Sequence, residues 1–434
     1  MGEKHQYQDF GHSHWHNSLI WGENLDNVSI LGSGMIDGAG LWKGLYPPLG
    51  PAPSTNPGNK AISLKCCKNV TLRDFSIYRG GHFAILATCV NNLTIDNIQI
   101  DTNRDGIDID VCRNVRITNV VVNSPNDDAI VLKTSFALGR KLSTENITIS
   151  NSIVSGYAMG TMLDGTYLVA DKPAPDQGGA TGRIKLGTES NGDFKNIVIS
   201  NIVFDHSRGL ALETVDGGNI EDVIVSNIVM RNITNSPIFL CLGGRLRGPE
   251  GITAGKLRRI NINNVIVHDA DPCYPILISG LPGHTIEDIK LNDMQIYSQG
   301  GLSLEEVAQQ PESLINSFFF NRDALSFPHE PLDVPLSTQS YPEPSMYGIL
   351  PASGLYIRHT DNIELNNIEI KYLKDDTRPA FVLQNVDQAY FTNVNANQAE
   401  DVPTFVLQHV NHFKMTQSKT LADTHHKQAE HISF

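Results

Sequence analysis

Short runs of alternating apolar and polar residues recur along most of the chain. One phrase has a polar residue, two alternating apolar positions, Asn or Asp, and then further apolar positions; it begins at Asn69, Asn92, Asn114, Asn146, Asn196, Asp222, Arg259, Asp288 and Asn362. A second series of alternating runs lies between these phrases and begins at His82, Gly106, Ala129, Arg183, Gly209, Pro237, Pro275, Gly354, Pro379 and Pro403. A period of two is typical of β-strands, so both series predict strands.

The spacing of the phrases predicts how these strands are arranged. Two or three short strands in each repeat of about 22 residues, with Asn at a fixed turn, are typical of a right-handed parallel β-helix. Asn suits such a turn because it tolerates the left-handed conformation and its amide can bond to the next coil. We therefore predict an all-β, single-domain right-handed parallel β-helix over residues 1–413.

Three segments do not follow the repeat. Residues 155–181 and 298–353 are too long for solenoid turns, and long loops of this kind usually wall a groove or cap an end. Residues 414–434 are polar and without a repeat, so we expect a C-terminal tail or cover.

Composition narrows the functional classes. The 434 residues are 40% hydrophobic, enough for a sizeable core, and the net charge of −14 argues against a nucleic-acid or anionic-membrane partner. No stretch of about 20 apolar residues is present, so no membrane span is expected. The six cysteines show no metal-ligand spacing. No signal peptide is visible at the start of the sequence.

Two acidic turns carry the candidate chemistry. Arg104-Asp105-Gly106 and Asn126-Asp127-Asp128 each precede an alternating run, and the runs align at an offset of 23 residues. If 23 residues make one coil, Asp105 and Asp128 lie one above the other, with strands about 4.8 Å apart. Carboxylates this crowded resist joint ionisation, so we expect at least one raised pKa. One carboxyl can then act as an acid while another acts as a base.

These turns resemble a known family. Asn103-Arg-Asp-Gly-Ile-Asp108 resembles the Asn-Thr-Asp-Gly-Ile-Asp motif of family 28 glycoside hydrolases, which include polygalacturonases and rhamnogalacturonan hydrolases. Asn126-Asp-Asp-Ala129 resembles their Gly-Asp-Asp-Cys or Gly-Asp-Asp-Ala motif. The resemblance extends from about Ile36 to Leu240. It implies a pectin-lyase-like solenoid without cofactor or metal, located outside the cell or in the periplasm.

The resemblance also implies a reaction. The family hydrolyses α-glycosidic bonds of pectin-like poly- or oligosaccharides, galacturonan or rhamnogalacturonan, with inversion. Asp127 then protonates the leaving oxygen, while Asp105 and Asp128 activate water on the opposite side. Inversion requires about 6.5–9.5 Å between acid and base. The long insertions imply exo action if they close one end of the groove.

The chain departs from the family at two motifs. A Gly-His-Gly is expected where Thr181-Gly182-Arg183 stands, and an Arg-Ile-Lys where Ala211 and Glu213 stand. Arg183 and Lys185 lie one coil earlier on the same outward face, with Lys185 in the column of Asp108. If the substrate carries a carboxylate near the cleavage point, these two residues are expected to grip it. The residues predicted to bind substrate are His82, Asp108, Lys133, Arg183, Lys185 and Glu213. His82 is equally consistent with a turn histidine.

Two alternatives remain open from the sequence. Asp105, Asp108, Asp110, Asp127 and Asp128 are oxygen ligands of the kind that Ca²⁺ prefers, as in a Ca²⁺-dependent polysaccharide lyase. The missing His and Arg-Ile-Lys also allow a non-catalytic carbohydrate-binding solenoid. The oligomeric state does not follow from the sequence.

Overall fold

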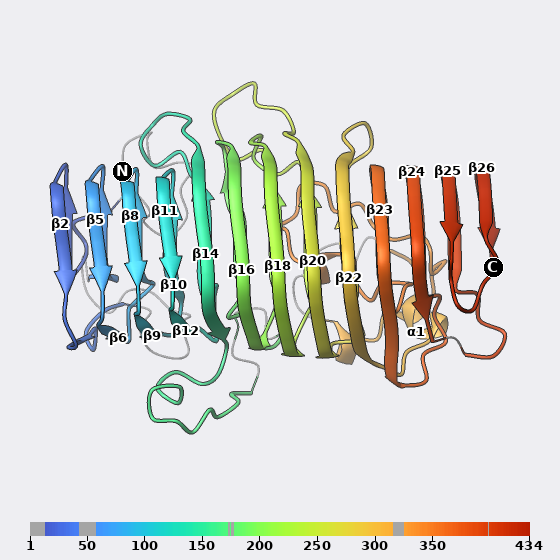
Figure 1. Cartoon of the computed structure of the whole chain (residues 1–434), viewed down its shortest axis with the longest axis horizontal. Coiled ribbons are helices and arrows are strands. Elements are labelled where there is room, and N and C mark those ends of the chain that lie inside the picture. Colours follow the sequence, from blue (N-terminus) through green and yellow to red (C-terminus); the bar gives the residue numbers. More distant parts are fainter. Residues whose placement is uncertain (1–13, 43–57, 172–173, 175–177, 316–324, 398) are drawn as a thin grey trace.

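The computed structural model describes residues 14–42, 58–171, 174, 178–315, 325–397 and 399–434. Within them the chain winds into a right-handed parallel β-helix, as predicted, whose coils lie side by side from the first strands to the last (Figure 1). Each wall of the helix is a parallel sheet, and we call these walls sheets A, B and C. The part of the predicted domain before His14 lies outside the described residues.

Sheet A carries the candidate site. Its strands pair in parallel with the equivalent strand one coil away; they are β1 (Ile20–Glu23), β4 (Lys60–Lys65), β7 (Phe83–Thr88), β10 (Asp105–Asp110), β13 (Ile130–Thr134), β15 (Ile184–Ser190), β17 (Leu210–Thr214), β19 (Ile238–Leu242) and β21 (Ile276–Ser279).

In the first coils, sheets B and C are formed by separate strands; in later coils, one continuous strand contributes to both sheets. Sheet B begins with β2 (Asp26–Leu31), β5 (Lys68–Arg73), β8 (Asn91–Asp96) and β11 (Arg113–Thr118). Sheet C begins with β3 (Met35–Asp37), β6 (Ser76–Tyr78), β9 (Gln99–Asp101) and β12 (Val121–Asn123). One bent strand then serves both sheets in β14 (Thr144–Ser155), β16 (Phe194–Ser207), β18 (Ile220–Ile233), β20 (Leu257–Ala270) and β22 (Ile286–Gly300).

In the last coils, single strands extend over even more of each coil. The strands β23 (Leu355–Lys374) and β24 (Phe381–Ala396) each run along sheets A, B and C in turn, and β25 (Phe405–Thr416) runs along sheets A and B. The C-terminal segment, expected as a tail or cover, forms β26 (Thr424–Ser433), which pairs antiparallel with β25. An antiparallel strand at this place ends the stack of parallel coils.

The Asn turns behave as the sequence predicted. Asn69, Asn92 and Asn146 all have φ between 55° and 62°. Their side chains bond from coil to coil: the Asn92 amide donates to Asn69 Oδ1 at 2.8 Å, and the Asn146 amide donates to Asn114 Oδ1 at 3.0 Å. Inside the coils, the alternating Ile, Val and Leu side chains form one continuous buried core. Each coil therefore buries its apolar face against its neighbours.

The two predicted insertions leave the solenoid at sheet ends. The chain leaves the solenoid between β14 and β15, and the described residues of this insertion extend beyond the coils (Figure 1). Asp101 fixes the insertion by accepting from the backbone amides of Gly160, Met162 and Leu163. Residues 301–354, which we call the closing segment, connect β22 to β23. They contain α1 (Leu304–Gln309) and the 3₁₀ turns η2 (Glu312–Leu314) and η4 (Pro344–Tyr347). No helix in the described residues is long and apolar enough to cross a membrane.

Candidate active site

A pocket opens on the outer face of sheet A, where β10, β13 and β15 begin. Its wall contains residues from four coils and one residue of the closing segment; they are His82, Arg104, Asp105, Asp127, Asp128, Lys133, Lys185, Gly187, Thr188, Glu189 and Tyr341. The side chains gather here because each acidic or basic turn stands at the start of a sheet A strand. Stacked coils bring equivalent turns to one place.

The predicted stacking of Asp105 and Asp128 is confirmed by the register. Ile107 pairs with Ile130, and Ile109 pairs with Leu132. The backbone N–H of Asp128 donates to Asp105 Oδ1 at 3.3 Å. The next coils place Val131, Lys185 and Ala211 in the column of Asp108, as the alignment of the repeats predicted.

Asp105 and Asp127 have opposite electrostatic surroundings. Asp105 is 3% exposed. Burial, and then the nearby Asp108 and Asp127, raise its pKa well above the usual value, in the direction that the crowding of carboxylates predicts. Burial also raises the pKa of Asp127, but Arg104, Lys133 and Lys185 outweigh it and hold this pKa below the usual value. Asp127 forms an ion pair with Arg104 and a hydrogen bond with Asp105.

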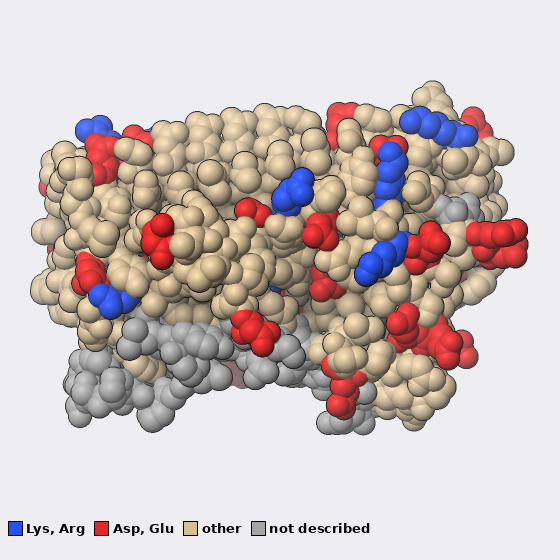
Figure 2. All heavy atoms as spheres, turned by 90° about the horizontal axis from the view of Figure 1, so that it is seen from below, with Lys and Arg blue, Asp and Glu red and all other residues tan. Residues whose placement is uncertain are grey.

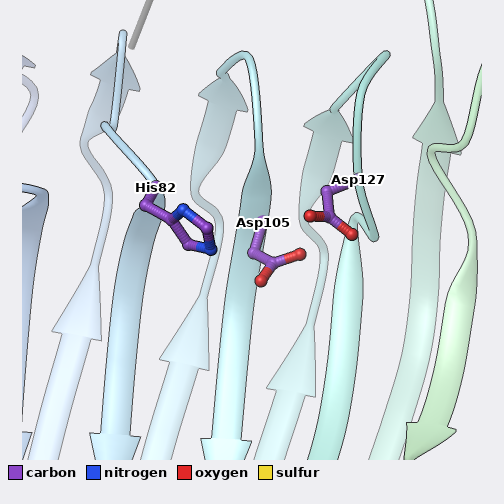
Figure 3. A group of neighbouring side chains, drawn as sticks. All are labelled: His82, Asp105 and Asp127. Atoms are coloured by element: carbon purple, nitrogen blue, oxygen red, sulfur yellow. The ribbon is translucent and has the colours of Figure 1, made fainter. Parts of the chain in front are cut away.

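The geometry of these groups is visible in Figure 3, where His82, Asp105 and Asp127 come from three neighbouring coils and lie side by side. Their nearest ligand atoms all lie within 4.8 Å of one another. His82 is 2% exposed, and its ring packs against Phe83 with the ring centroids 4.4 Å apart. His82 is therefore both a buried turn residue and part of the pocket wall.

Lys133 holds the acidic side of the pocket together. Its Nζ lies 2.8 Å from Asp108, 3.5 Å from Asp105 and 3.8 Å from Glu189. Burial lowers the pKa of Lys133, but these carboxylates outweigh it and raise the pKa well above the usual value. Asp108 is fully buried beside the pocket rather than in its wall. Its role in the structure is to hold Lys133.

The displaced cations are engaged by protein carboxylates. Arg183 Nε donates to Asp128 Oδ1 at 2.6 Å, and its Nη1 donates to Glu343 of the closing segment at 3.0 Å. Lys185 Nζ lies 3.1 Å from Glu213 and donates to the Tyr341 hydroxyl at 3.2 Å. Lys185 lines the pocket, whereas Arg183 and Glu213 are buried behind the wall.

Sequence reasoning missed four residues that shape the pocket. Arg104 differs from the Thr of the family motif, and this difference was the signal that marked it. Glu189, Tyr341 and Glu343 gave no signal, because they lie outside the two acidic turns. The last two reach the site only through the path of the closing segment.

A metal ion suits this cluster poorly. His82, Asp105 and Asp127 are close enough to share an ion. However, Asp127 pairs with Arg104 and Asp105 with Lys133, so protein cations already balance both carboxylates. The proposed Ca²⁺ ligands are also divided among separate partners: Asp110 accepts from the Ser135 hydroxyl at 2.6 Å, and Asp128 from Arg183. Imidazole is in addition not a usual Ca²⁺ ligand.

The outer surface has a different charge from the pocket. On the face in Figure 2, acidic side chains outnumber basic ones and stand in separate groups, in keeping with the net charge of −14. A polyanion approaching this face therefore meets little positive charge.

Comparison with known proteins shows a similarity in both sequence and fold. Residues 5–161 match the family model described as glycosyl hydrolases family 28. The fold is similar to that of the hyperthermoactive exopolygalacturonase from Thermotoga maritima, with a TM-score of 0.51 and 20% identity over 64% of this chain and 67% of that one. It is also similar to the family 28 exopolygalacturonase of Yersinia enterocolitica, with a TM-score of 0.52 and 14% identity over 76% of this chain and 46% of that one. No curated protein matches the chain.

The match over residues 5–161 covers both acidic turns, so the part of the chain that carries these turns is similar to glycosyl hydrolases of family 28. This similarity agrees with the resemblance that the motifs of the two acidic turns indicated.

Proposed function

We propose that this enzyme hydrolyses an α-glycosidic bond of a pectin-like substrate, galacturonan or rhamnogalacturonan, with inversion and from a chain end. The observation that carries the proposal is the hydrogen-bonded pair Asp105 and Asp127, whose pKa values are pushed apart in one pocket. Such a pair supplies one protonated and one ionised carboxyl at the same pH. A polymeric substrate of this kind also favours an extracellular or periplasmic location.

The proposed roles account for the protons over a full cycle. Asp127 gives its proton to the leaving oxygen, while Asp105, with Asp128, takes a proton from the attacking water. The cycle ends with Asp105 protonated and Asp127 ionised, in the direction in which their surroundings shift the two pKa values. The hydrogen bond between the two carboxyls gives the proton a direct path back to Asp127.

Exo action is supported by the closing segment. Its Glu343 bonds to Arg183, Arg208 and Asn235, which stand at the starts of three successive sheet A strands. Apolar residues of the same segment, Val334, Met346, Tyr347 and Leu350, bury the outer face of sheet A over the later coils. A substrate chain bound at the pocket cannot continue along sheet A in this direction.

The stereochemical outcome is the sharpest test of the mechanism. The nearest atoms of Asp105 and Asp127 lie within 4.8 Å, which is below the spacing of about 6.5–9.5 Å typical of inverting enzymes. We therefore place the attacking water between Asp105 and Asp128. Asp105 is pinned by the Asp128 amide and by Lys133, which disfavours its attack on the sugar carbon. Proton NMR of fresh digests should show the β-anomer first; the α-anomer would establish retention.

A second experiment separates hydrolysis from elimination. Oligogalacturonides should be cleaved to saturated products identified by mass, and EDTA should leave the rate unchanged. Loss of activity with EDTA, or a product that absorbs near-ultraviolet light, would instead support the Ca²⁺-dependent lyase. If pectic oligosaccharides bind but are not cleaved under any condition, the chain is a carbohydrate-binding solenoid.

A further inference from the structure

We propose that Arg104 is the receptor for a carboxylate of the substrate, and that this carboxylate draws Arg104 away from Asp127. The inference rests on the proposed function, since it requires an acidic sugar in this pocket. It assigns to Arg104 the recognition that the sequence assigned to Arg183 and Lys185. It also links recognition of the charged sugar to the acid that cleaves the bond.

The first argument comes from the partners of the pocket cations. Among the described residues, the cations in the wall are Arg104, Lys133 and Lys185. Lys133 lies within 4 Å of three carboxylates, and Lys185 lies close to Glu213 and Asp128. Asp108 and Glu213 are fully buried. Moving either lysine toward a substrate would therefore leave a buried carboxylate without compensation, which is strongly unfavourable.

Arg104 differs from the two lysines in that the carboxylate of its ion pair is partly exposed. It pairs with Asp127, whose side chain is 23% exposed. Asp127 can therefore be solvated or can take up a proton when the guanidinium leaves. Arg104 also offers the planar fork of donors that matches a carboxylate with two hydrogen bonds.

The exchange of partners would move the proton to the place where the reaction needs it. Arg104 lowers the pKa of Asp127, whereas burial and the neighbouring Asp108 and Asp127 raise the pKa of Asp105. Once a substrate carboxylate neutralises Arg104, Asp127 loses this stabilisation of its charge. The proton can then pass from Asp105 to Asp127 through their hydrogen bond. No proton enters or leaves the pair in this step.

Binding measurements test the proposal without relying on turnover. Galacturonic acid and galactose differ by the carboxylate and can be titrated calorimetrically into wild-type protein, Arg104→Gln and Arg104→Lys. We expect wild type to prefer galacturonic acid, and Arg104→Gln to bind it about 10–150-fold more weakly, the effect of one charge-assisted contact. Galactose affinity should not change, and Arg104→Lys should keep part of the preference. Arg113→Gln is the matched control, because Arg113 lies on the same coil and pairs with Glu145 away from the pocket.

Equal losses for both sugars would show that Arg104 only supports the pocket and would overturn the proposal. The proposal would also be overturned if wild type showed no preference for galacturonic acid, or if Arg104→Gln kept that preference. Thermal unfolding of each variant shows whether the protein is folded. If Arg104→Gln is not folded, Arg104→Lys decides, since it keeps the charge and loses the fork.

Turnover supplies the second arm. On oligogalacturonide, Arg104→Gln should lower kcat/KM about 10–150-fold. On the methyl-esterified substrate, the kcat/KM of this variant should not fall, because the variant lacks the guanidinium that holds Asp127 ionised. A parallel fall on both substrates would contradict the proposal. If wild type cleaves neither substrate, the proposed hydrolysis fails, and the binding measurements still decide the role of Arg104.

Discussion

At the scale of single residues, the three carboxyls of the site are distinguished by their neighbours. Asp127 is the most exposed and faces Arg104, Asp105 is buried against Lys133, and Asp128 is held by Arg183. Small differences in position thus give the same side chain three different environments. Asparagine variants separate these roles, because the amide keeps the shape and cannot supply or accept the proton.

Asp127→Asn should abolish turnover without lowering the unfolding temperature, because this side chain is partly exposed. Asp105→Asn and Asp128→Asn should each lower kcat by at least about 10²-fold, the usual effect of a lost general base. Product release and thermal unfolding measure both effects. Asp387→Asn is a control, since Asp387 pairs with His412 far along the solenoid. Full activity in Asp127→Asn would remove this residue from the mechanism.

Glu213 predicts a pH dependence of stability. It is fully buried, and burial outweighs Lys185 and raises its pKa from 4.5 to about 7. At pH values between 4.5 and about 7, the folded state therefore keeps a proton on Glu213 that the unfolded chain has already released. The contribution of this protonation to the free energy of unfolding is complete below pH about 4.5 and is lost as pH rises through about 7. It amounts to roughly 3 kcal/mol.

Glu213→Gln should remove this dependence. Denaturant unfolding of wild type should show a loss of stability from pH 4.5 to 7 that is absent from the variant, so the difference between the two proteins changes with pH. A wild-type curve parallel to that of Glu213→Gln would show that Glu213 is ionised throughout this range.

At the scale of elements, the closing segment joins the insertion to the solenoid through one buried carboxylate. Glu343 is 1% exposed and accepts from Arg183 Nη1 at 3.0 Å, Arg208 Nη1 at 2.9 Å and Asn235 Nδ2 at 3.1 Å. Removal of one partner from a buried ion pair usually costs about 3–5 kcal/mol, because the remaining charges lose their compensation. This contact therefore decides whether the segment stays on sheet A.

Glu343→Gln should lower the unfolding temperature and loosen the blocked end of the groove. We expect cleavage of internal bonds to increase relative to release of end units, which viscosity and product length of a pectic polymer measure together. Glu305→Gln is the matched control, because Glu305 is an exposed acid in the same segment. If Glu343→Gln is destabilised and the products remain unchanged, the segment does not set the exo action.

At the scale of the whole molecule, a stack of coils needs an end. Phe381 and Phe405 stack with ring centroids 4.6 Å apart, and Phe434 continues this stack at 5.2 Å from Phe405. β26 covers the last parallel strand along its length. Without such a cap, a solenoid exposes an apolar core and an open strand edge to other chains.

Deletion of residues 424–434 should therefore lower the unfolding temperature and promote self-association, as measured by thermal unfolding and size-exclusion chromatography. The reason is the exposure of Phe405 and Phe413 together with the edge of β25. Lys427→Gln, an exposed change on β26, should behave as wild type. A deletion variant that remains monomeric and equally stable would show that β26 is not the cap.

The sequence by itself determined the solenoid, because each coil repeats the same alternation and the same Asn turn. That repetition fixed the register, and the register alone placed Asp105 above Asp128 and Lys185 in the column of Asp108. Only the tertiary structure decided what these groups contact. Glu343 and Tyr341 lie more than 150 residues from Arg183 and Lys185, and no local pattern connects them. Likewise, the sequence placed Arg104 in the acidic turn, but its pairing with Asp127 depends on side-chain packing between coils. The physical reason is that the strand register aligns only the backbones of neighbouring coils, whereas burial and charge decide which side chains pair.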